Sequence, residues 1–351
     1  MQETIFVVDD SDSNLAMATD ALSEHYRVLT MPSAERMFTL LEKVTPDLIL
    51  LDIEMPEING FEALRRLKTS DKHSHIPVIF LTGMTDASVE VRGFQLGVVD
   101  FIAKPFSAPV LLNRVKTHLD IDEIIRERTE QIKRLKNTIV FGFADVVEKR
   151  DYETGGHIAR TSDYIEVLVR AMISRGVHAE SLDNIDLESF VSSARLHDVG
   201  KIAIPDSILK KPGKLSIEEF AIMKTHVTEG IAIIEHMCSR ADDSEFLKTA
   251  ALFAGYHHER WDGMGYPYGL KGSEIPLPGR IMAVVDVYDA LVSERPYKEP
   301  FTHEKAVSII MENSGKQFDP FIADVFYEIK DDFNSIKQQY ASGDGAGERK
   351  D

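Results

Sequence analysis

The sequence predicts two folded domains joined by a long helix: an α/β doubly wound parallel-sheet domain, then an all-helical domain. The chain has 351 residues, more than a single hydrophobic core usually serves. Before residue 120, short apolar runs alternate with helical stretches, which is typical of a parallel sheet covered by helices. From about residue 140 such runs nearly vanish, and apolar residues recur with the 3.6-residue period of a helix.

Four apolar runs in the first 120 residues are expected to be buried parallel strands, separated by four helices. The expected strands are residues 4–9, 47–52, 77–82 and 98–102, and the expected helices are 14–25, 34–43, 60–68 and 87–96. In an open parallel sheet, sites form at the carboxyl ends of the strands. Those ends carry Asp9, Asp10, Asp52, Thr82 and Lys104.

These strand-end residues fit one chemistry. Three carboxylates brought together repel one another, so a hard divalent cation such as Mg²⁺ is expected among them. Asp52 can then attack a phosphoryl donor as a nucleophile, while Lys104 and Thr82 hold the phosphoryl oxygens. An acid at a strand end can also simply cap the next helix, but capping does not account for all five residues together.

This region resembles the response-regulator receiver domain over residues 1–120, through "VVDDSDSN", "LILLDIEMPEINGFE", "PVIFLTGMTD" and "DFIAKPF". The resemblance implies phosphorylation of Asp52 by a cognate sensor histidine kinase, with Thr82 as the switch hydroxyl. The implied Mg²⁺ ligands are Asp9 or Asp10, Asp52 and the backbone carbonyl of Glu54. The chain departs from the pattern at Phe101, where many receivers carry a tyrosine. Aromatic packing can survive this change, but a hydroxyl contact cannot.

Residues 121–139 are expected to form a helical connector that continues the last receiver helix. Between residues 108 and 150 the chain has no glycine before Gly142 and no proline except Pro109. The recurring apolar positions are Leu112, Val115, Leu119, Ile125, Ile132, Leu135 and Ile139. Their partly heptad-like spacing favours a parallel coiled coil between two chains, and hence a homodimer. A single amphipathic helix packed on its own domain is the alternative.

Residues 140–335 are expected to form a helical domain in which histidines and acids cluster. The expected helices are 139–150, 157–174, 186–199, 216–239, 245–257, 279–293 and 303–313. Because Cys238 is the single cysteine, any metal must use nitrogen and oxygen ligands. The clusters offer more ligands than one tetrahedral zinc uses, so two or three octahedral metals are expected. Asp198, directly after His197, is the natural carboxylate bridge. His178, His236 and His303 are expected to be ordinary structural or surface residues.

This half resembles the HD-GYP branch of the HD-domain metal phosphohydrolases over about residues 140–330. The matching motifs are "HDVGKIAIPD", "HHERWDGMGYP", "LKGSEIPLPGRIMAVVDVYDAL" and "SERPYK". The resemblance implies hydrolysis of the second messenger cyclic di-GMP to pGpG, GMP or both. The implied metal ligands are Glu153, His157, His197, Asp198, His226, His257, His258 and Asp286. The acid at position 153 favours a third metal, and mixed nitrogen and oxygen sites favour iron or manganese.

The expected reaction is attack of water on a phosphodiester phosphorus, helped by metals that activate the water and clamp the phosphate. Asp198 and Lys201 are the expected catalytic residues, with Lys201 steadying a phosphoryl oxygen or the leaving group. Arg295 and Lys298 are expected to grip phosphate. Tyr266 offers a ring for guanine stacking and a hydroxyl. Within "HHERWDGMGYP", both histidines are expected to serve the second metal, and Gly263 and Gly265 let the chain turn sharply.

Composition narrows the function classes. A formal net charge of −18 argues against a general nucleic-acid binder, and no apolar stretch is long enough to insert in a membrane. The N-terminus lacks the basic region of a signal peptide, and one cysteine excludes an intrachain disulfide, so a cytoplasmic protein is expected. Residues 336–351 are polar and glycine-rich towards the end and are expected to be a disordered tail.

Two other functions stay open for the second domain. It can sense cyclic di-GMP, or dock GGDEF-type or adaptor proteins, with little turnover. It can also act on a different cyclic dinucleotide, because the chemistry of the metal ligands does not read the base.

Overall fold

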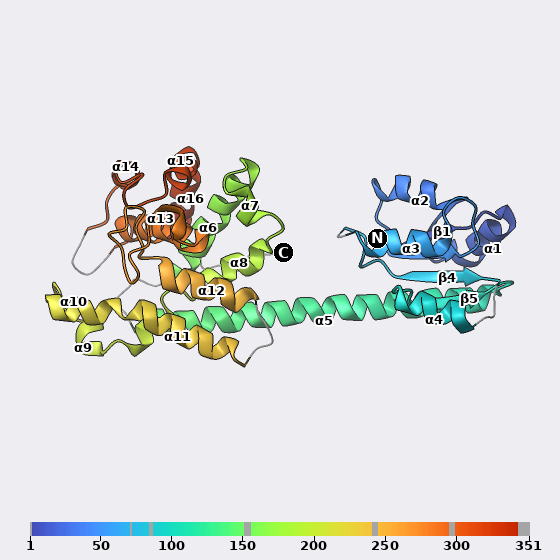
Figure 1. Ribbon diagram of the computed structural model, residues 1–351, viewed down its shortest axis with the longest axis horizontal. Coiled ribbons are helices and arrows are strands. Elements are labelled where there is room, and N and C mark those ends of the chain that lie inside the picture. Colours follow the sequence, from blue (N-terminus) through green and yellow to red (C-terminus); the bar gives the residue numbers. More distant parts are fainter. Residues whose placement is uncertain are drawn as a thin grey trace. The chain divides into compact units, whose positions relative to one another are not determined.

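The computed structural model describes residues 2–70, 72–83, 87–150, 156–240, 245–294 and 299–342 (Figure 1). The chain divides into two compact units, residues 1–133 and 134–351. Helix α5 (Ala108–Glu148) is continuous across the boundary between them. Among the described helices, none combines the length and apolar character needed to cross a lipid bilayer.

The first unit is a five-stranded parallel sheet in the order β2-β1-β3-β4-β5, so the predicted doubly wound sheet is confirmed. Its strands are β1 (Thr4–Val8), β2 (Arg27–Met31), β3 (Leu48–Asp52), β4 (Val78–Thr82) and β5 (Asp100–Ala103). Its other helices are α1 (Asp12–Leu22), α2 (Ala34–Leu41), α3 (Gly60–Lys68) and α4 (Ala87–Gln95). Two apolar clusters form the core, one on each face of the sheet.

The sequence analysis missed strand β2. This strand pairs only with β1 and lies at the edge of the sheet, where most of its side chains are at least partly exposed. An edge strand therefore needs no continuous apolar run, and "RVLTM" has none. The central strands β1, β3 and β4 are fully buried, which is why their runs were readable.

Helix α5 confirms the predicted long connector helix. Near its start, Leu111, Val115 and Leu119 are buried in the core of the first unit. Further along, the apolar side chains of Ile125 and Ile132 are 58% and 67% exposed. The helix thus packs on the first unit over its first turns, and Ala144 and Val147 near its end are buried within the second unit.

The second unit is built from helices, as predicted. They are α6 (His157–Ser174), α7 (Ala179–Leu182), α8 (Leu187–Ala194), η1 (Val199–Ala203), α9 (Asp206–Leu209), α10 (Ile217–Lys224), α11 (His226–Cys238), α12 (Glu245–Tyr256), η2 (Gly272–Glu274), α13 (Leu277–Val292), α14 (His303–Glu312), α15 (Pro320–Glu328) and α16 (Lys330–Ala341). Its main core joins α6 and α13 to the last three helices. At the centre, the Tyr164 ring stacks on Phe333 and meets Tyr288 edge-on.

Three expectations for this unit were wrong in detail. The expected helix 186–199 ends with α8, and a turn leads into the short helix η1. The expected helix 216–239 is two helices, because α11 packs on η1 and α12 whereas α10 buries no residue. The expected disordered tail does not begin at residue 336, because Ile336 is buried in the core and α16 continues to Ala341.

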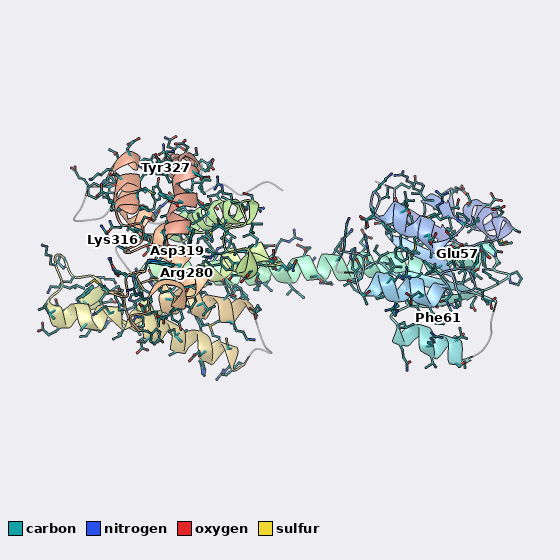
Figure 2. All side chains as sticks on the ribbon, turned by 45° about the horizontal axis from the view of Figure 1, so that its top comes forward. Glu57, Phe61, Arg280, Lys316, Asp319 and Tyr327 are labelled. Atoms are coloured by element: carbon teal, nitrogen blue, oxygen red, sulfur yellow. The ribbon has the colours of Figure 1, made fainter. Side chains whose placement is uncertain are left out.

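The histidines expected to be structural lie outside the histidine cluster. His178 contacts Asp319, which caps α15 and also pairs with Arg280 (Figure 2). His303 hydrogen-bonds the buried Tyr288 hydroxyl through Nδ1. His236 is exposed on α11.

Candidate metal centre

Separate segments of the second unit bring the predicted metal ligands together. His157 begins α6, His197 and Asp198 lie between α8 and η1, and His226 begins α11. His257 and His258 follow the end of α12. The donor atoms form two groups, each within 4.8 Å: His157, His197 and Asp198 in one, and His226, His257 and His258 in the other.

Asp198 lies between the two groups and offers one oxygen to each. Its Oδ2 is 3.4 Å from Nε2 of His197. Its Oδ1 is 3.4 Å from Nε2 of His226 and 3.7 Å from Nε2 of His257. This is the position that a carboxylate bridging two metals would need.

The Nδ1 atoms of three histidines contact carbonyl oxygens of the preceding turn. His197 contacts Ala194, His226 contacts Met223 and His257 contacts Ala254, at 3.0, 2.7 and 3.0 Å. A carbonyl only accepts hydrogen bonds, so each Nδ1 carries the proton and donates it. The Nε2 atoms are therefore left to face the space around Asp198. This is the second contact that metal-binding histidines usually make.

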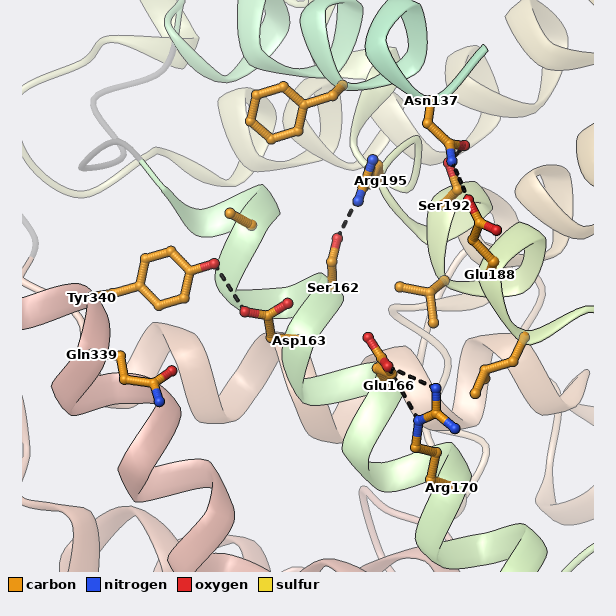
Figure 3. Close-up of a pocket in the computed structure, with 14 residues that line it drawn as sticks. Asn137, Ser162, Asp163, Glu166, Arg170, Glu188, Ser192, Arg195, Gln339 and Tyr340 are labelled. Atoms are coloured by element: carbon orange, nitrogen blue, oxygen red, sulfur yellow. Dashed lines mark hydrogen bonds and ion pairs between the residues drawn. The ribbon is translucent and has the colours of Figure 1, made fainter. Parts of the chain in front are cut away.

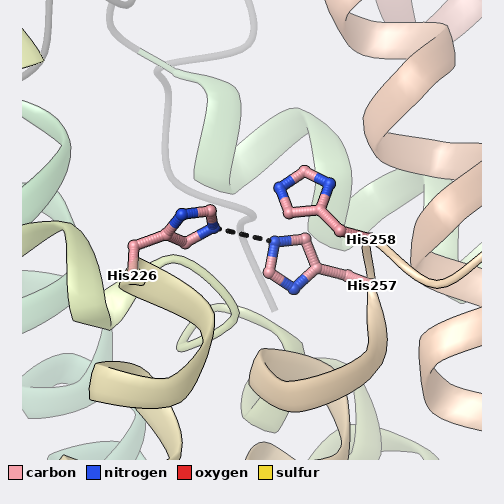
Figure 4. Close-up of side chains that lie close together, drawn as sticks. All are labelled: His226, His257 and His258. Atoms are coloured by element: carbon pink, nitrogen blue, oxygen red, sulfur yellow. Dashed lines mark hydrogen bonds between the residues drawn. The ribbon is translucent and has the colours of Figure 1, made fainter. Parts of the chain in front are cut away.

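The Nε2 atoms of His226 and His257 are 3.4 Å apart (Figure 4). Burial lowers the pKa of both histidines, so both rings are neutral at pH 7. With the proton of each ring on Nδ1, two lone pairs point at each other in a buried space. A cation between them turns this repulsion into coordination, so the donor set fits a metal site.

His157 is oriented by a carboxylate that the sequence analysis missed. Its Nδ1 is 2.8 Å from Oδ2 of Asp289, a buried residue on α13. Arg160 binds the same carboxylate through two hydrogen bonds of 2.7 and 3.0 Å. Burial alone would raise the pKa of Asp289, but the bonds from His157 and Arg160 outweigh it and lower that pKa to about 2. The sequence did offer a signal for Asp289: it is a second aspartate, one turn after Asp286, on an otherwise apolar helix.

Lys201 and Asp286 lie next to the first group. The Lys201 ammonium is 2.8 Å from Oδ2 of Asp198, and Oδ1 of Asp286 is 3.9 Å from Nε2 of His157. Burial alone would raise the pKa of Asp198, but the charge of Lys201 and the neighbouring imidazoles hold it well below its usual range. The Asp198 carboxylate is therefore ionised at neutral pH.

The paired histidines converge because they are not on a helix. Helix α12 ends at Tyr256, and the rings of His257 and His258 are 4.0 Å apart in the turn that follows. Burial lowers the pKa of His258 to about 4, so it too is neutral at pH 7. The Tyr266 ring stacks on His258, with centroids 4.8 Å apart and planes 30° apart. The turn thus places the Tyr266 ring against the predicted ligand His258.

The turn after the histidines is held by Glu259, another residue that the sequence analysis missed. This buried carboxylate accepts backbone hydrogen bonds from Tyr268, Gly269 and Leu270 at 2.7 to 3.1 Å. Gly265 packs so closely on the Glu259 backbone that a Cβ there would clash. Gly263 has a φ of 83°, which favours glycine. A charge inside a glycine-rich motif was the signal for Glu259.

Three predicted site residues, Glu153, Arg295 and Lys298, lie outside the described residues. Their proposed roles therefore rest on the motifs that carry them.

The strand-end residues of the first unit also come together. Asp9, Asp10 and Asp52 place ligand oxygens within 4.8 Å of one another. Lys104 reaches two of them, at 2.7 Å from Asp9 Oδ2 and 2.8 Å from Asp52 Oδ1. Burial raises the pKa of Asp52, because a charge there is poorly solvated. This arrangement fits a divalent cation beside a carboxylate nucleophile.

Three further residues of the predicted receiver site lie on or next to strands β3, β4 and β5. Thr82 ends strand β4 and is buried, and the backbone N–H of Glu54 donates to Oδ1 of Asp52 at 3.3 Å. The Phe101 ring packs on Phe80 and Phe94, with centroids 5.6 and 5.1 Å apart. An aromatic cluster therefore surrounds the position where many receivers carry a tyrosine.

A cavity of about 990 Å³ in the second unit lies beside α6, α8 and α16 (Figure 3). Its acids already have partners. Glu166 pairs with Arg170, and Asp163 accepts from the Tyr340 hydroxyl. No histidine lines it among the described residues, so the clustered donors around Asp198 are the better candidate site.

Comparisons with known proteins bear out both resemblances at the level of domain families. Residues 5–116 match the response regulator receiver domain, and residues 121–322 match the HD domain. A probable cyclic di-GMP phosphodiesterase of Vibrio cholerae is 39% identical over 98% of this chain and 82% of its own length. The cyclic di-GMP phosphodiesterase response regulator RpfG of Xanthomonas campestris is 34% identical over 96% of this chain and 90% of its own length. A 3'3'-cGAMP-specific phosphodiesterase 2 of Vibrio cholerae is 39% identical over 59% of this chain and 37% of its own length.

Proposed function

The chain belongs to the response regulators that join a receiver domain to an HD domain, and from that premise we propose that it hydrolyses cyclic di-GMP under the control of phosphorylation at Asp52. The product is pGpG, GMP or both. The observation that carries the proposal is the convergence of five imidazoles around the ionised Asp198. Two relatives that span most of the chain are named for this activity.

The proposed metal ligands divide between two positions that share Asp198. One position has His157, His197 and Asp286, and the other has His226, His257 and His258. Glu153 is proposed to hold a third metal. Iron or manganese suits such mixed nitrogen and oxygen ligands. When bound, these metals supply a nucleophilic hydroxide at neutral pH and positive charge for the phosphate oxygens.

The residues of the chain position the phosphodiester for attack by water at phosphorus. The Lys201 ammonium, beside Asp198, is proposed to donate a hydrogen bond to a phosphoryl oxygen or to the departing ribose oxygen. Arg295 and Lys298 are proposed to hold the non-bridging phosphate oxygens. The Tyr266 ring, which lies against His258, is proposed to stack on a guanine base. Catalysis then depends on orientation and charge neutralisation.

The direct test is chromatography of products after incubation with Mn²⁺ or Fe²⁺ and each cyclic dinucleotide. Cleavage of cyclic di-GMP alone supports the proposal. Cleavage of another dinucleotide instead favours the alternative function, hydrolysis of a different cyclic dinucleotide. The relative named as a 3'3'-cGAMP-specific phosphodiesterase motivates this alternative. No product from any of them favours a binding module. Docking of GGDEF-type or adaptor proteins on the exposed Met264 and Tyr268 can coexist with turnover.

The receiver domain is proposed to accept a phosphoryl group on Asp52 from a sensor histidine kinase. Mg²⁺ would be held by Asp9 or Asp10, by Asp52 and by the carbonyl of Glu54. Lys104 already contacts Asp52 and would hold the phosphoryl oxygens together with Thr82. Phosphorylation would add charge at the end of strand β3, and the aromatic packing of Phe101 on β5 is proposed to relay the change.

Asp52→Ala is expected to abolish the response of cyclic di-GMP hydrolysis to a phosphoryl donor, because the variant has no carboxylate to modify. The measurement is the hydrolysis rate of each protein with and without acetyl phosphate. Asp10→Ala retains the acceptor and is the matched control, with a weakened response. Either of two results would show that phosphorylation of Asp52 does not control hydrolysis. One is a wild-type rate that acetyl phosphate leaves unchanged, and the other is an Asp52→Ala protein that responds as the wild type does.

We also propose that two chains associate through a parallel coiled coil along α5. Ile125, Ile132 and Ile139 recur every seven residues and are 58%, 67% and 62% exposed. Leu135 lies at the intermediate position of the same heptads, also exposed. β-Branched residues at one seam position with leucine at the other favour parallel dimers.

Ile132→Asp is expected to convert the dimer to a monomer, because a carboxylate in the seam loses solvation without gaining a partner. Sedimentation equilibrium measures the change. Ile173→Asp, at an exposed isoleucine on α6, should leave the dimer intact. A monomeric wild-type protein at tens of micromolar would contradict the coiled coil.

A further inference from the structure

Helix α10 carries an exposed aromatic ring next to the metal ligands. Phe220 is 48% exposed, and α10 buries none of its residues. The Phe220 ring meets the Tyr266 ring edge-on, with centroids 6.5 Å apart and planes 79° apart. Tyr266 in turn stacks on His258. A series of rings thus leads from a proposed metal ligand to the surface of the unit.

The ammonium of Lys224 lies over two of these rings. Its Nζ is 5.3 Å from the centre of Phe220 and 5.5 Å from the centre of Tyr266. Within the described residues, Lys224 makes no hydrogen bond or ion pair. Two other lysines of this part of the unit already have partners, since Lys201 binds Asp198 and Lys211 binds Glu219. Lys224 therefore has its three donors available to a ligand.

Building on the proposed function, we propose that Phe220 and Lys224 of α10, with Tyr266, form the recognition site for a guanine base of the substrate. The aromatic rings supply faces on which a base stacks. Guanine offers two neighbouring acceptors, O6 and N7, to the lysine ammonium. Adenine places an amino group, a donor, where guanine has O6, so the same ammonium disfavours it.

The position of Lys224 favours a base contact over a phosphate contact. Lys201 occupies the place beside Asp198 where a scissile phosphate must lie, whereas Lys224 lies over aromatic faces. A lysine that binds phosphate would increase the affinity for every phosphodiester to a similar degree. A base contact would serve guanine alone, so the two roles predict different substrate preferences.

The test compares the full-length wild type with Phe220→Ala, Lys224→Met and Lys224→Arg. Ile222→Ala, at another exposed residue of α10, is the matched control. The substrates are cyclic di-GMP and bis(p-nitrophenyl) phosphate, which has no base. GMP and AMP are compared as inhibitors of bis(p-nitrophenyl) phosphate hydrolysis. Calorimetric binding of cyclic di-GMP to the metal-stripped proteins gives a readout that does not depend on turnover.

Phe220→Ala is expected to lower kcat/KM for cyclic di-GMP about tenfold or more, mainly through KM, and to weaken binding by a similar factor. Lys224→Met should lower the preference for GMP over AMP about tenfold, and Lys224→Arg should largely restore it. Hydrolysis of bis(p-nitrophenyl) phosphate and the metal content should stay unchanged in all variants. Ile222→Ala should behave as the wild type.

Equal losses on cyclic di-GMP and bis(p-nitrophenyl) phosphate would overturn the guanine site, because they would indicate damage to the metal centre or a phosphate grip. Wild-type values in both Phe220→Ala and Lys224→Met, with cyclic di-GMP still cleaved, would also overturn it while leaving the proposed function intact. A wild-type protein that cleaves bis(p-nitrophenyl) phosphate but no cyclic di-GMP would instead refute the proposed function.

Discussion

Asp198→Ala protein is expected to lose turnover of cyclic di-GMP by about a thousandfold or more, with both units still folded. The two oxygens of Asp198 face different histidine groups, so their removal weakens both metal positions at once. Metal charge contributes several kcal/mol to such reactions, and each 1.36 kcal/mol is about tenfold in rate. Product chromatography measures the loss, and metal analysis after Mn²⁺ loading gives its cause.

His258→Ala provides the comparison that isolates the bridging role. It removes a ligand of one position only, so about one metal per chain should be lost while the remaining metals stay. Phosphorylation of the receiver should be unaffected in both variants. His236→Ala, at an exposed histidine outside the cluster, should keep full activity. Normal hydrolysis by metal-loaded Asp198→Ala protein would rule out the assigned bridge.

Asp289→Ala is expected to destabilise the HD domain by about 3–5 kcal/mol, the usual consequence of removing one partner from a buried ion pair. Arg160 would lose its carboxylate while remaining buried. His157 would lose the acceptor that fixes its Nδ1 proton, so metal affinity should fall about 10- to 100-fold. Urea unfolding and metal titration measure the two effects separately.

A double variant separates the two roles of Asp289. Arg160→Met in the Asp289→Ala background removes the buried charge, so much of the lost stability should return. Metal affinity should stay low, because His157 still lacks its acceptor. If the single Asp289→Ala variant is as stable as the wild type, the ion pair between Asp289 and Arg160 does not contribute to the stability of the domain.

The sequence predicted best those features that one segment determines by itself. Continuous apolar runs lead to Asp9, Asp52 and Thr82 at or directly after the ends of the central strands. Both the strands and the site at their ends could therefore be predicted. Strand β2 was missed, because an edge strand has no such run. The long helix α5 was predictable from its periodicity and its lack of early glycine.

Features that depend on distant segments could not be predicted in the same way. Asp289 was missed because its partner Arg160 lies 129 residues away in the chain. The convergence of His257 and His258 depends on α12 ending at Tyr256, which an uninterrupted helical pattern did not indicate. Helices α10 and α11 were read as one, because their separation follows from packing on other helices.

The histidine contacts have a consequence for how the centre assembles. His197, His226 and His257 direct Nδ1 to a carbonyl three residues earlier, so each ring is oriented once its own turn has formed. His157 depends on Asp289, 132 residues later in the chain, and is oriented only after α6 packs on α13. The rings of His226 and His257 are therefore oriented by local contacts, whereas the ring of His157 is oriented only by the tertiary fold.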